Sequence, residues 1–216
     1  MSTFKTILEK TISAEIIEKK SRFIANLFFI DSSEQAEQII KDIKKKYHDA
    51  KHNCFAYLIY EKNSIIKKYS DDGEPSGTAG LPMLEILEKQ KIYNILIIVT
   101  RYFGGILLGT GGLVRAYSDS LKKALNVATI VEQENGFEVN VEIAYSDLEK
   151  FKYYCNKNNI NIINCSYLDT VICKIEINDE EKNNLIKEIN SENNLKIISF
   201  DIFRQKNISK LLNNVD

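Results

Sequence analysis

The chain has 216 residues, of which 44% are hydrophobic and 10% aromatic, and its formal net charge is −1. This composition excludes a globally disordered protein, and the length allows one large domain or two small ones. Residues 1–10 lack a cationic segment followed by an apolar run, and no apolar stretch approaches the roughly 18 to 20 residues of a membrane span. The sequence therefore predicts a protein that is neither secreted nor inserted into a membrane.

The first half of the chain opens with strands and a helix. Ile12–Ile30 is apolar and β-branched but is interrupted at residues 19–21, which predicts two strands joined by a tight turn. Asp31 and Ser32 are candidate N-caps, and the residues after them fit a capping box. Apolar residues then recur at helical spacing, which predicts a helix that runs to about Tyr47.

Two further strands and two helices follow in the first half. Asn53–Tyr60 and Ser64–Tyr69 are predicted strands, and Pro82 then marks the first turn of a helix, where its missing N–H costs nothing. Ile95–Val99 is continuously apolar, as in a strand covered on both faces, so it should be central in its sheet. A glycine-rich loop then leads to an amphipathic helix over residues 113–128.

A change of composition predicts a domain boundary near Ile130–Asn135. Only one glycine remains after this point, and the sign of the charge reverses. Residues 1–130 contain 19 Lys and Arg against 15 Asp and Glu, whereas residues 131–216 contain 10 against 15. We therefore predict domains over residues 1–130 and 136–205, followed by a tail over residues 206–216. The positive first half favours an anionic partner, although its excess charge is well short of that of a dedicated nucleic-acid-binding domain.

The second half is predicted to alternate strands and helices in the order βαββαβ. Ser146 and Asn178 are candidate caps of the two helices, each with a Glu three residues later. This order is typical of the ferredoxin-like sandwich, so the whole chain is predicted to be an α+β protein of two domains. The predicted strands are Phe137–Ile143, Ile160–Tyr167, Val171–Ile177 and Lys196–Phe203.

The cysteines indicate a reducing environment. They show no C-x-x-C spacing and stand in apolar stretches, at Cys54, Cys155, Cys165 and Cys173. This pattern predicts reduced, packed thiols and a cytoplasmic protein.

The densest functional signal lies between Asp71 and Arg115. Eight of the nine glycines fall between residues 73 and 112, which implies either positive φ angles or a surface that a ligand approaches closely. A glycine loop that leads into a helix presents unpaired N–H groups and the positive end of the helix dipole to an anion. The alternative is that these glycines only permit tight turns and close packing. The predicted anion- or nucleic-acid-binding residues are Arg101, Gly104, Gly105, Gly109, Gly111, Gly112 and Arg115.

Two nucleotide-binding motifs do not fit this loop. The segment from Gly104 to Gly109 has the G-x-x-x-x-G spacing of a P-loop, but Thr110 and Gly111 stand where Lys and then Ser or Thr are required. Gly109 and Gly111 begin a dinucleotide-binding pattern, but Val114 replaces its third glycine. No nucleotide cofactor is therefore predicted.

A second polar group precedes the glycine loop and forms a candidate accessory site. Its carboxylates could bind a hard cation or act as acid and base, or its Asp-Asp-Gly segment could be simple turn chemistry. His48, His52 and Cys54 have an H-x-x-x-H-x-C spacing, but a closed zinc site needs a fourth ligand. We predict no metal, no cofactor and no catalytic residue. The accessory site comprises His52, Asp71, Asp72, Glu74, Ser76 and Thr78.

These motifs resemble the YigZ/IMPACT family, and they cover most of residues 15–125. The resemblance implies an N-terminal α/β sandwich like the second domain of a small-subunit ribosomal protein. It also implies a C-terminal domain like the end of elongation factor G. Eukaryotic relatives act in translational control by binding an activator of the amino-acid-starvation kinase, and nucleic-acid binding has been proposed for bacterial members. The motifs are Lys20–Phe23, His52–Cys54, Asp71–Gly80, Arg101–Gly105 and Gly112–Tyr117.

Three functional hypotheses follow. The first is a non-enzymatic protein of translation regulation that holds RNA, the ribosome or a translation factor, with Arg101 and Arg115 on its anionic groups. The second is an enzyme that acts on a small phosphorylated or carboxylated metabolite, and it requires a concave pocket where its acid and base converge. The third is a structural adaptor, which predicts an exposed apolar patch near Tyr102, Phe103 and Ile106.

Overall fold

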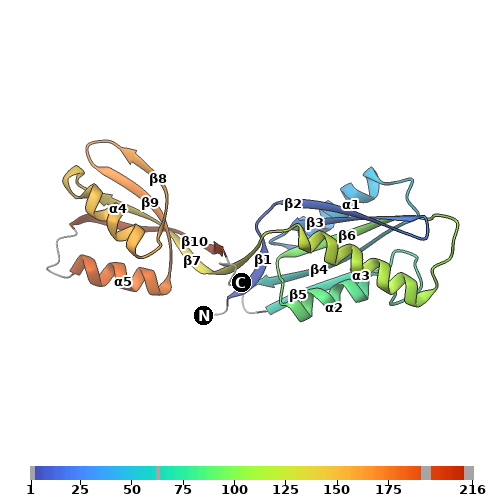
Figure 1. The fold of residues 1–216 in the computed structure, drawn as a ribbon. Helices are drawn as coiled ribbons and strands as arrows, with labels where there is room; N and C mark the ends of the chain where they lie inside the picture. The colour runs from blue at the N-terminus through green and yellow to red at the C-terminus, as the bar shows by residue number, and fades with distance from the viewer. Residues whose placement is uncertain (1–2, 62–63, 191–195, 212–216) are drawn as a thin grey trace. The chain divides into compact units, whose positions relative to one another are not determined.

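The computed structural model describes residues 3–61, 64–190 and 196–211. The chain divides into two compact units, one built on Phe4–Glu132 and the other on Gln133–Lys210, which we call the N-terminal and C-terminal units. Each unit combines helices with a β-sheet (Figure 1), which confirms the predicted α+β class with two domains. None of the helices in the described ranges is long and apolar enough to cross a membrane.

The N-terminal unit contains a five-stranded antiparallel sheet. Its strand order is β2-β3-β6-β4-β5. The strands are β2 (Thr11–Glu18), β3 (Ser21–Phe29), β4 (His52–Glu61), β5 (Ser64–Ser70) and β6 (Ile95–Tyr102). The continuously apolar segment forms β6, which is the middle strand, as predicted.

Both faces of this sheet are covered by helices. α1 (Ser33–Lys46) packs on one face, against side chains that include Leu96 and Ile98 of β6. α2 (Gly80–Gln90) and α3 (Thr110–Asn126) pack on the other face, against the alternate residues of the same strand (Figure 1). Because both faces are covered, neither set of alternating side chains on β6 meets water, so the strand is apolar over most of its length. Each large aliphatic side chain buried in this way stabilises the fold by about 1.5–3 kcal/mol.

Local signals at the start of the N-terminal unit are also confirmed. Lys19 and Lys20 adopt positive φ angles of 44° and 65°, and they form the tight turn between β2 and β3. Ser32 is the N-cap of α1, and its side chain accepts a hydrogen bond of 3.3 Å from the Gln35 N–H. The Gln35 side chain in turn accepts a hydrogen bond of 2.9 Å from the Asp31 N–H, so Gln35 is the residue that reaches back from the first turn of α1.

A short strand at the start of the chain was not predicted. β1 (Phe4–Ile7) pairs with β7 (Ile130–Ile143), and the Leu8 N–H donates a hydrogen bond of 2.9 Å to the Thr129 carbonyl next to it. The sequence analysis placed a boundary segment at residues 130–135, and this segment forms the beginning of β7.

The C-terminal unit follows the predicted βαββαβ order. Its sheet has the strand order β8-β9-β7 with β10 on the other side of β7, which is the ferredoxin-like arrangement. β9 alternates buried and partly exposed residues over most of its length. After β7, the elements are α4 (Leu148–Lys157), β8 (Asn161–Tyr167), β9 (Val171–Asn178), α5 (Asp179–Asn190) and β10 (Ile197–Leu211).

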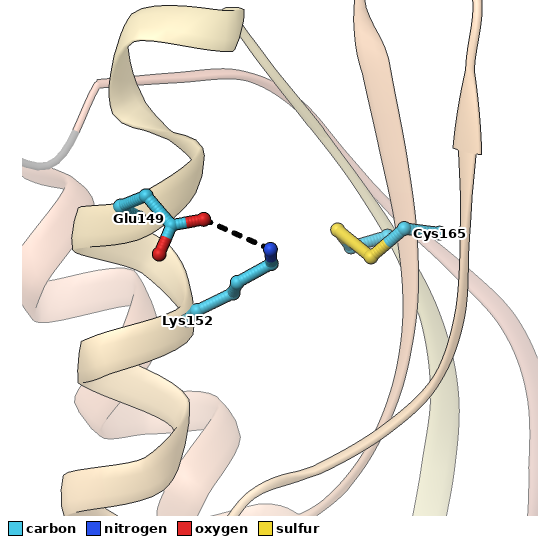
Figure 2. The surroundings of a disulfide bond; sticks show 4 residues. Glu149, Lys152 and Cys165 are labelled. Atoms are coloured by element: carbon cyan, nitrogen blue, oxygen red, sulfur yellow. Dashed lines mark hydrogen bonds and ion pairs between the residues drawn. A yellow bond between two sulfur atoms is a disulfide. The ribbon is translucent and has the colours of Figure 1, made fainter.

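One of the two predicted caps in this unit is correct. Asn178 and Glu181 exchange two hydrogen bonds of 2.8 Å at the start of α5, as a capping box requires. The cap predicted at Ser146 is wrong, because residues 145–147 form a 3₁₀ turn and Asp147 is the N-cap of α4. Glu149 instead accepts a bond of 2.9 Å from Lys152, as Figure 2 shows.

The prediction of four reduced thiols is wrong for two of them. Cys165 and Cys173 lie opposite each other on β8 and β9 and are joined by a disulfide (Figure 2), whereas Cys54 and Cys155 are free and buried. The hairpin brings the Cα atoms of the pair within 4.2 Å although eight positions separate them in sequence. A search for short cysteine motifs cannot detect this cross-strand proximity.

Candidate functional site

A pocket in the N-terminal unit collects many of the residues that the sequence analysis singled out. Its walls come from the start of β4, the loop between β5 and α2, the end of β6, and the loop that leads into α3. Its volume is about 410 Å³. The lining residues are Lys51, His52, Gly73, Glu74, Pro75, Arg101, Phe103, Leu107, Leu108, Gly109, Thr110 and Leu113.

A buried ion pair forms one wall of the pocket. The Arg101 and Glu74 side chains are only 7% and 3% exposed, and Arg101 NH1 lies 2.6 Å from Glu74 Oε1. The same oxygen accepts a hydrogen bond of 2.8 Å from the Tyr117 hydroxyl. Arg101 also lies between the rings of Phe23 and Phe103, 5.4 and 5.7 Å from their centroids.

This arrangement corrects the role predicted for Arg101. A guanidinium free to meet phosphate was predicted, but Glu74 supplies a carboxylate from within the protein to this group. The Nε atom is the exception, because it is buried and has no hydrogen-bond partner among the residues that the structure describes. Arg101 is therefore mainly a fixed part of the pocket wall.

His52 is held in a single orientation beside this pair. Its Nδ1 lies 2.8 Å from the Asp72 carbonyl oxygen, and a carbonyl can only accept, so Nδ1 carries the proton. In the neutral ring, Nε2 then has a free lone pair, and it lies 3.9 Å from Glu74 Oε2. His52 thus offers the pocket wall an acceptor next to a carboxylate.

The two aspartates have structural contacts. The Asp71 carboxylate accepts hydrogen bonds of 2.8, 3.0 and 2.8 Å from three backbone N–H groups before and at the start of α2, those of residues 77, 79 and 80. Asp72 accepts from the Asn53 N–H at 2.7 Å and pairs with Lys44 at 2.6 Å. These contacts fit the alternative prediction, in which the Asp-Asp-Gly segment stabilises a turn and does not bind a cation or a substrate.

The other residues of the accessory site either stabilise the loop or line the pocket. The Thr78 hydroxyl donates to the Pro75 carbonyl at 2.6 Å and so belongs to the loop, and Ser76 is exposed. Only His52 and Glu74 of this group line the pocket. The enzyme hypothesis required an acid and a base to converge in a concavity, and these two residues do so while Asp72 does not.

The glycines have different surroundings from one another. A Cβ at Gly104 would overlap the Lys20 carbonyl, and the Gly104 N–H donates to the Ser21 hydroxyl at 3.2 Å. The structure therefore corrects the role predicted for Gly104, which is close backbone packing and not an open amide donor. Gly109 has a φ of +72° with open space around it, and it is the N-cap of α3 without a side-chain cap. The first-turn amides of α3 thus start from an uncapped end.

The two arginines do not share a pocket. Arg115 is exposed, its Nε donates to the Gly111 carbonyl at 3.3 Å, and it lines a second hollow of about 270 Å³ together with Lys19. Arg101 lines the larger pocket, and Leu108 contributes to both. The two predicted anion-binding arginines therefore line two different hollows.

The loop before α3 exposes large apolar side chains. Phe103, Ile106 and Leu107 are 48%, 42% and 83% exposed, and we call residues 103–107 the apolar loop. The adaptor hypothesis predicted such a patch near Tyr102, Phe103 and Ile106. Tyr102 is only partly exposed and its hydroxyl donates to Asp49 at 2.9 Å, and Leu107, the most exposed residue of the loop, was missed. Tyr117 was also missed as a polar residue, because its position in the helix stripe indicated only core packing.

Comparison with known proteins gives matches in both halves of the chain. Residues 19–125 match the family described as Impact N-terminal domain, and residues 141–191 match a domain of unknown function, DUF1949. The chain is 40% identical to IMPACT family member YvyE of Bacillus subtilis, over 78% of this chain and 77% of that protein. It is 36% identical to IMPACT family member YigZ of Escherichia coli, over 77% and 81%.

A solved structure is similar over almost the full length. A protein described only as hypothetical superposes with a TM-score of 0.61 and is 30% identical, and the match covers 92% of this chain and 98% of that one.

Proposed function

The chain belongs to the IMPACT family, and on that premise we propose that it is a non-enzymatic binding protein that regulates translation in the cytoplasm. The N-terminal unit would bind a component of the translation machinery: RNA, the ribosome or a translation factor. The role that the resemblance implies for eukaryotic members supports the connection with translation.

The apolar loop is the observation that carries the proposal. Large apolar side chains on a protruding loop are costly in water unless they are covered part of the time, and interfaces typically bury such anchors at their centre. Leu107 is 83% exposed, and the loop leads directly into the uncapped end of α3. An apolar anchor beside a source of positive potential fits a partner that has both apolar and anionic groups, as ribosomal surfaces do.

Sedimentation with purified ribosomes tests this proposal. The Leu107→Asp variant places a charge on the anchor and should weaken binding by at least about tenfold. Leu168→Asp is the matched control, because Leu168 is 67% exposed in the turn between β8 and β9 of the C-terminal unit. Loss of binding in the first variant alone supports the proposal, and wild-type protein that binds neither ribosomes, nor ribosomal RNA, nor purified translation factors contradicts it.

The salt dependence of the same complex separates RNA from a protein partner. If phosphate contacts dominate, affinity should fall steeply with salt, and Arg115→Ala should reduce the slope by about one unit. If the complex is insensitive to salt but is lost in Leu107→Asp, the partner surface is a protein.

A further inference from the structure

The larger pocket in the N-terminal unit carries an excess of positive charge. Lys51 and Arg101 are cationic and Glu74 is anionic, so these three lining residues sum to one positive charge. The first turn of α3 adds the positive end of a helix dipole, because Gly109 supplies no capping side chain. The pocket therefore favours an anion that carries a single charge.

One buried donor in the wall is without a partner. Arg101 is only 6% exposed, NH1 is held by Glu74 at 2.6 Å, and NH2 reaches the Ser21 hydroxyl only at 3.5 Å. Its Nε is buried with no partner among the described residues. A buried donor of a cationic group usually has an acceptor, so the guanidinium is under-satisfied by the described chain. Because Nε has less than 1 Å² of exposed surface, an acceptor in the pocket would meet the part of Arg101 that lines it and not Nε itself.

The rest of the lining is apolar. Side chains from the loops before α2 and α3 and from the first turns of α3 contribute hydrocarbon or aromatic surface, and the volume of about 410 Å³ is that of a site for a small organic molecule. These side chains are Pro75, Phe103, Leu107, Leu108 and Leu113.

We propose that this pocket binds a small organic carboxylate, a monoanion with an apolar body. The carboxylate accepts hydrogen bonds from Lys51, from Arg101 and from the first turn of α3, and the body packs against the aromatic and leucine side chains. A phosphate monoester, with its second negative charge, is disfavoured because Glu74 lies in the same wall. The inference does not rest on the proposed role in translation, because the pocket belongs to one unit and needs no macromolecular partner.

Binding of three probes that share one ring system tests the proposal. The probes are phenylacetate, its neutral analogue 2-phenylethanol and the dianion phenyl phosphate, each titrated into the full chain and followed by calorimetry and by amide shifts. Charge-assisted hydrogen bonds are worth about 1.5–3 kcal/mol, so phenylacetate should bind roughly 10- to 100-fold more tightly than 2-phenylethanol. Phenyl phosphate should bind more weakly than phenylacetate.

Two variants locate the site without disturbing the buried ion pair. Lys51→Gln, at an exposed lining residue, should weaken phenylacetate binding about five- to tenfold and leave 2-phenylethanol binding unchanged. Lys45→Gln, on the exposed side of α1, is the matched control and should change neither. Thr110→Phe, at the exposed first residue of α3, should fill the pocket and abolish binding of both.

Several outcomes would overturn the proposal. They are equal affinity for acid and alcohol, tighter binding of phenyl phosphate, no effect of Lys51→Gln, or no binding of phenylacetate at about 10 mM, which is well above the range of a specific site. Because no ribosome or RNA is present in these titrations, their failure leaves the translation proposal standing.

Discussion

The two units place their polar groups differently. In the N-terminal unit both faces of the sheet are covered, and the end of the β6 core holds an ion pair, a tyrosine hydroxyl and a histidine. In the C-terminal unit, α4 and α5 cover one apolar face of the sheet, and residues such as Glu138 and Lys174, which pair at 2.9 Å, point to the other face. The Arg101–Glu74 pair is buried on both sides, with side chains 7% and 3% exposed, whereas in the C-terminal pair Glu138 is buried and the Lys174 side chain is 30% exposed. The complete burial of both charges therefore distinguishes the pair of the N-terminal unit.

The largest expected effect is that of removing the buried carboxylate. Glu74→Ala leaves the Arg101 guanidinium in a site that is only 7% exposed with no counter-charge, so the free energy of unfolding of the N-terminal unit should fall by about 3–5 kcal/mol. Urea unfolding followed by hydrogen exchange of peptides from each unit measures this, since the two units need not unfold together.

A surface ion pair of the same unit provides the matched control. Glu37→Ala removes the partner of Lys68, a pair of 2.8 Å whose side chains are 41% and 52% exposed, and should cost less than about 1 kcal/mol. If both variants lost the same free energy of unfolding, burial would not make the Glu74 pair more important than a surface pair. The proposed difference between the two units would then be wrong.

The prediction from sequence was most accurate where burial dictates residue type. Ile95–Val99 was predicted to be a strand covered on both faces and forms the middle strand β6, and the predicted strand Val171–Ile177 forms β9. Apolar spacing does not define the buried face of α5, because two helix faces fit it: Leu185 is buried, whereas Ile186 is 38% exposed.

The candidate site could be located from sequence but not assembled. Glycine density pointed to the correct loops, yet the pairing of Glu74 with Arg101 joins residues 27 positions apart and has no sequence signature. The same holds for Tyr117, whose hydroxyl reaches Glu74 from the other side of the core. Long-range polar contacts depend on strand register, which local patterns do not define.

A second prediction concerns the disulfide, which should affect only the C-terminal unit. The loop-entropy model gives about 2.5 kcal/mol for a bridge that closes eight positions, so reduction should destabilise the unit by that amount. Unfolding with and without dithiothreitol, again followed unit by unit, measures the change. A Cys165→Ala, Cys173→Ala variant should show no response to the reductant, and a shift in the N-terminal unit would contradict the assignment.

The smallest expected effect compares the helix caps of the two units. Asn178 is 6% exposed and takes part in two capping bonds of 2.8 Å, and its side chain donates a further bond of 2.9 Å to Glu134, whereas Ser32 makes one exposed bond of 3.3 Å. Asn178→Ala should therefore cost about 1 kcal/mol or slightly more, and Ser32→Ala about half as much. Asn178→Asp keeps the acceptor for the Glu181 N–H but replaces the amide donor to Glu134 by a second carboxylate, so it should recover little of the loss in the same unfolding experiment. If Ser32→Ala lowered the free energy of unfolding more than Asn178→Ala, burial would not determine how strongly a polar contact stabilises either unit. The buried polar network around Glu74 would then no longer distinguish the N-terminal unit.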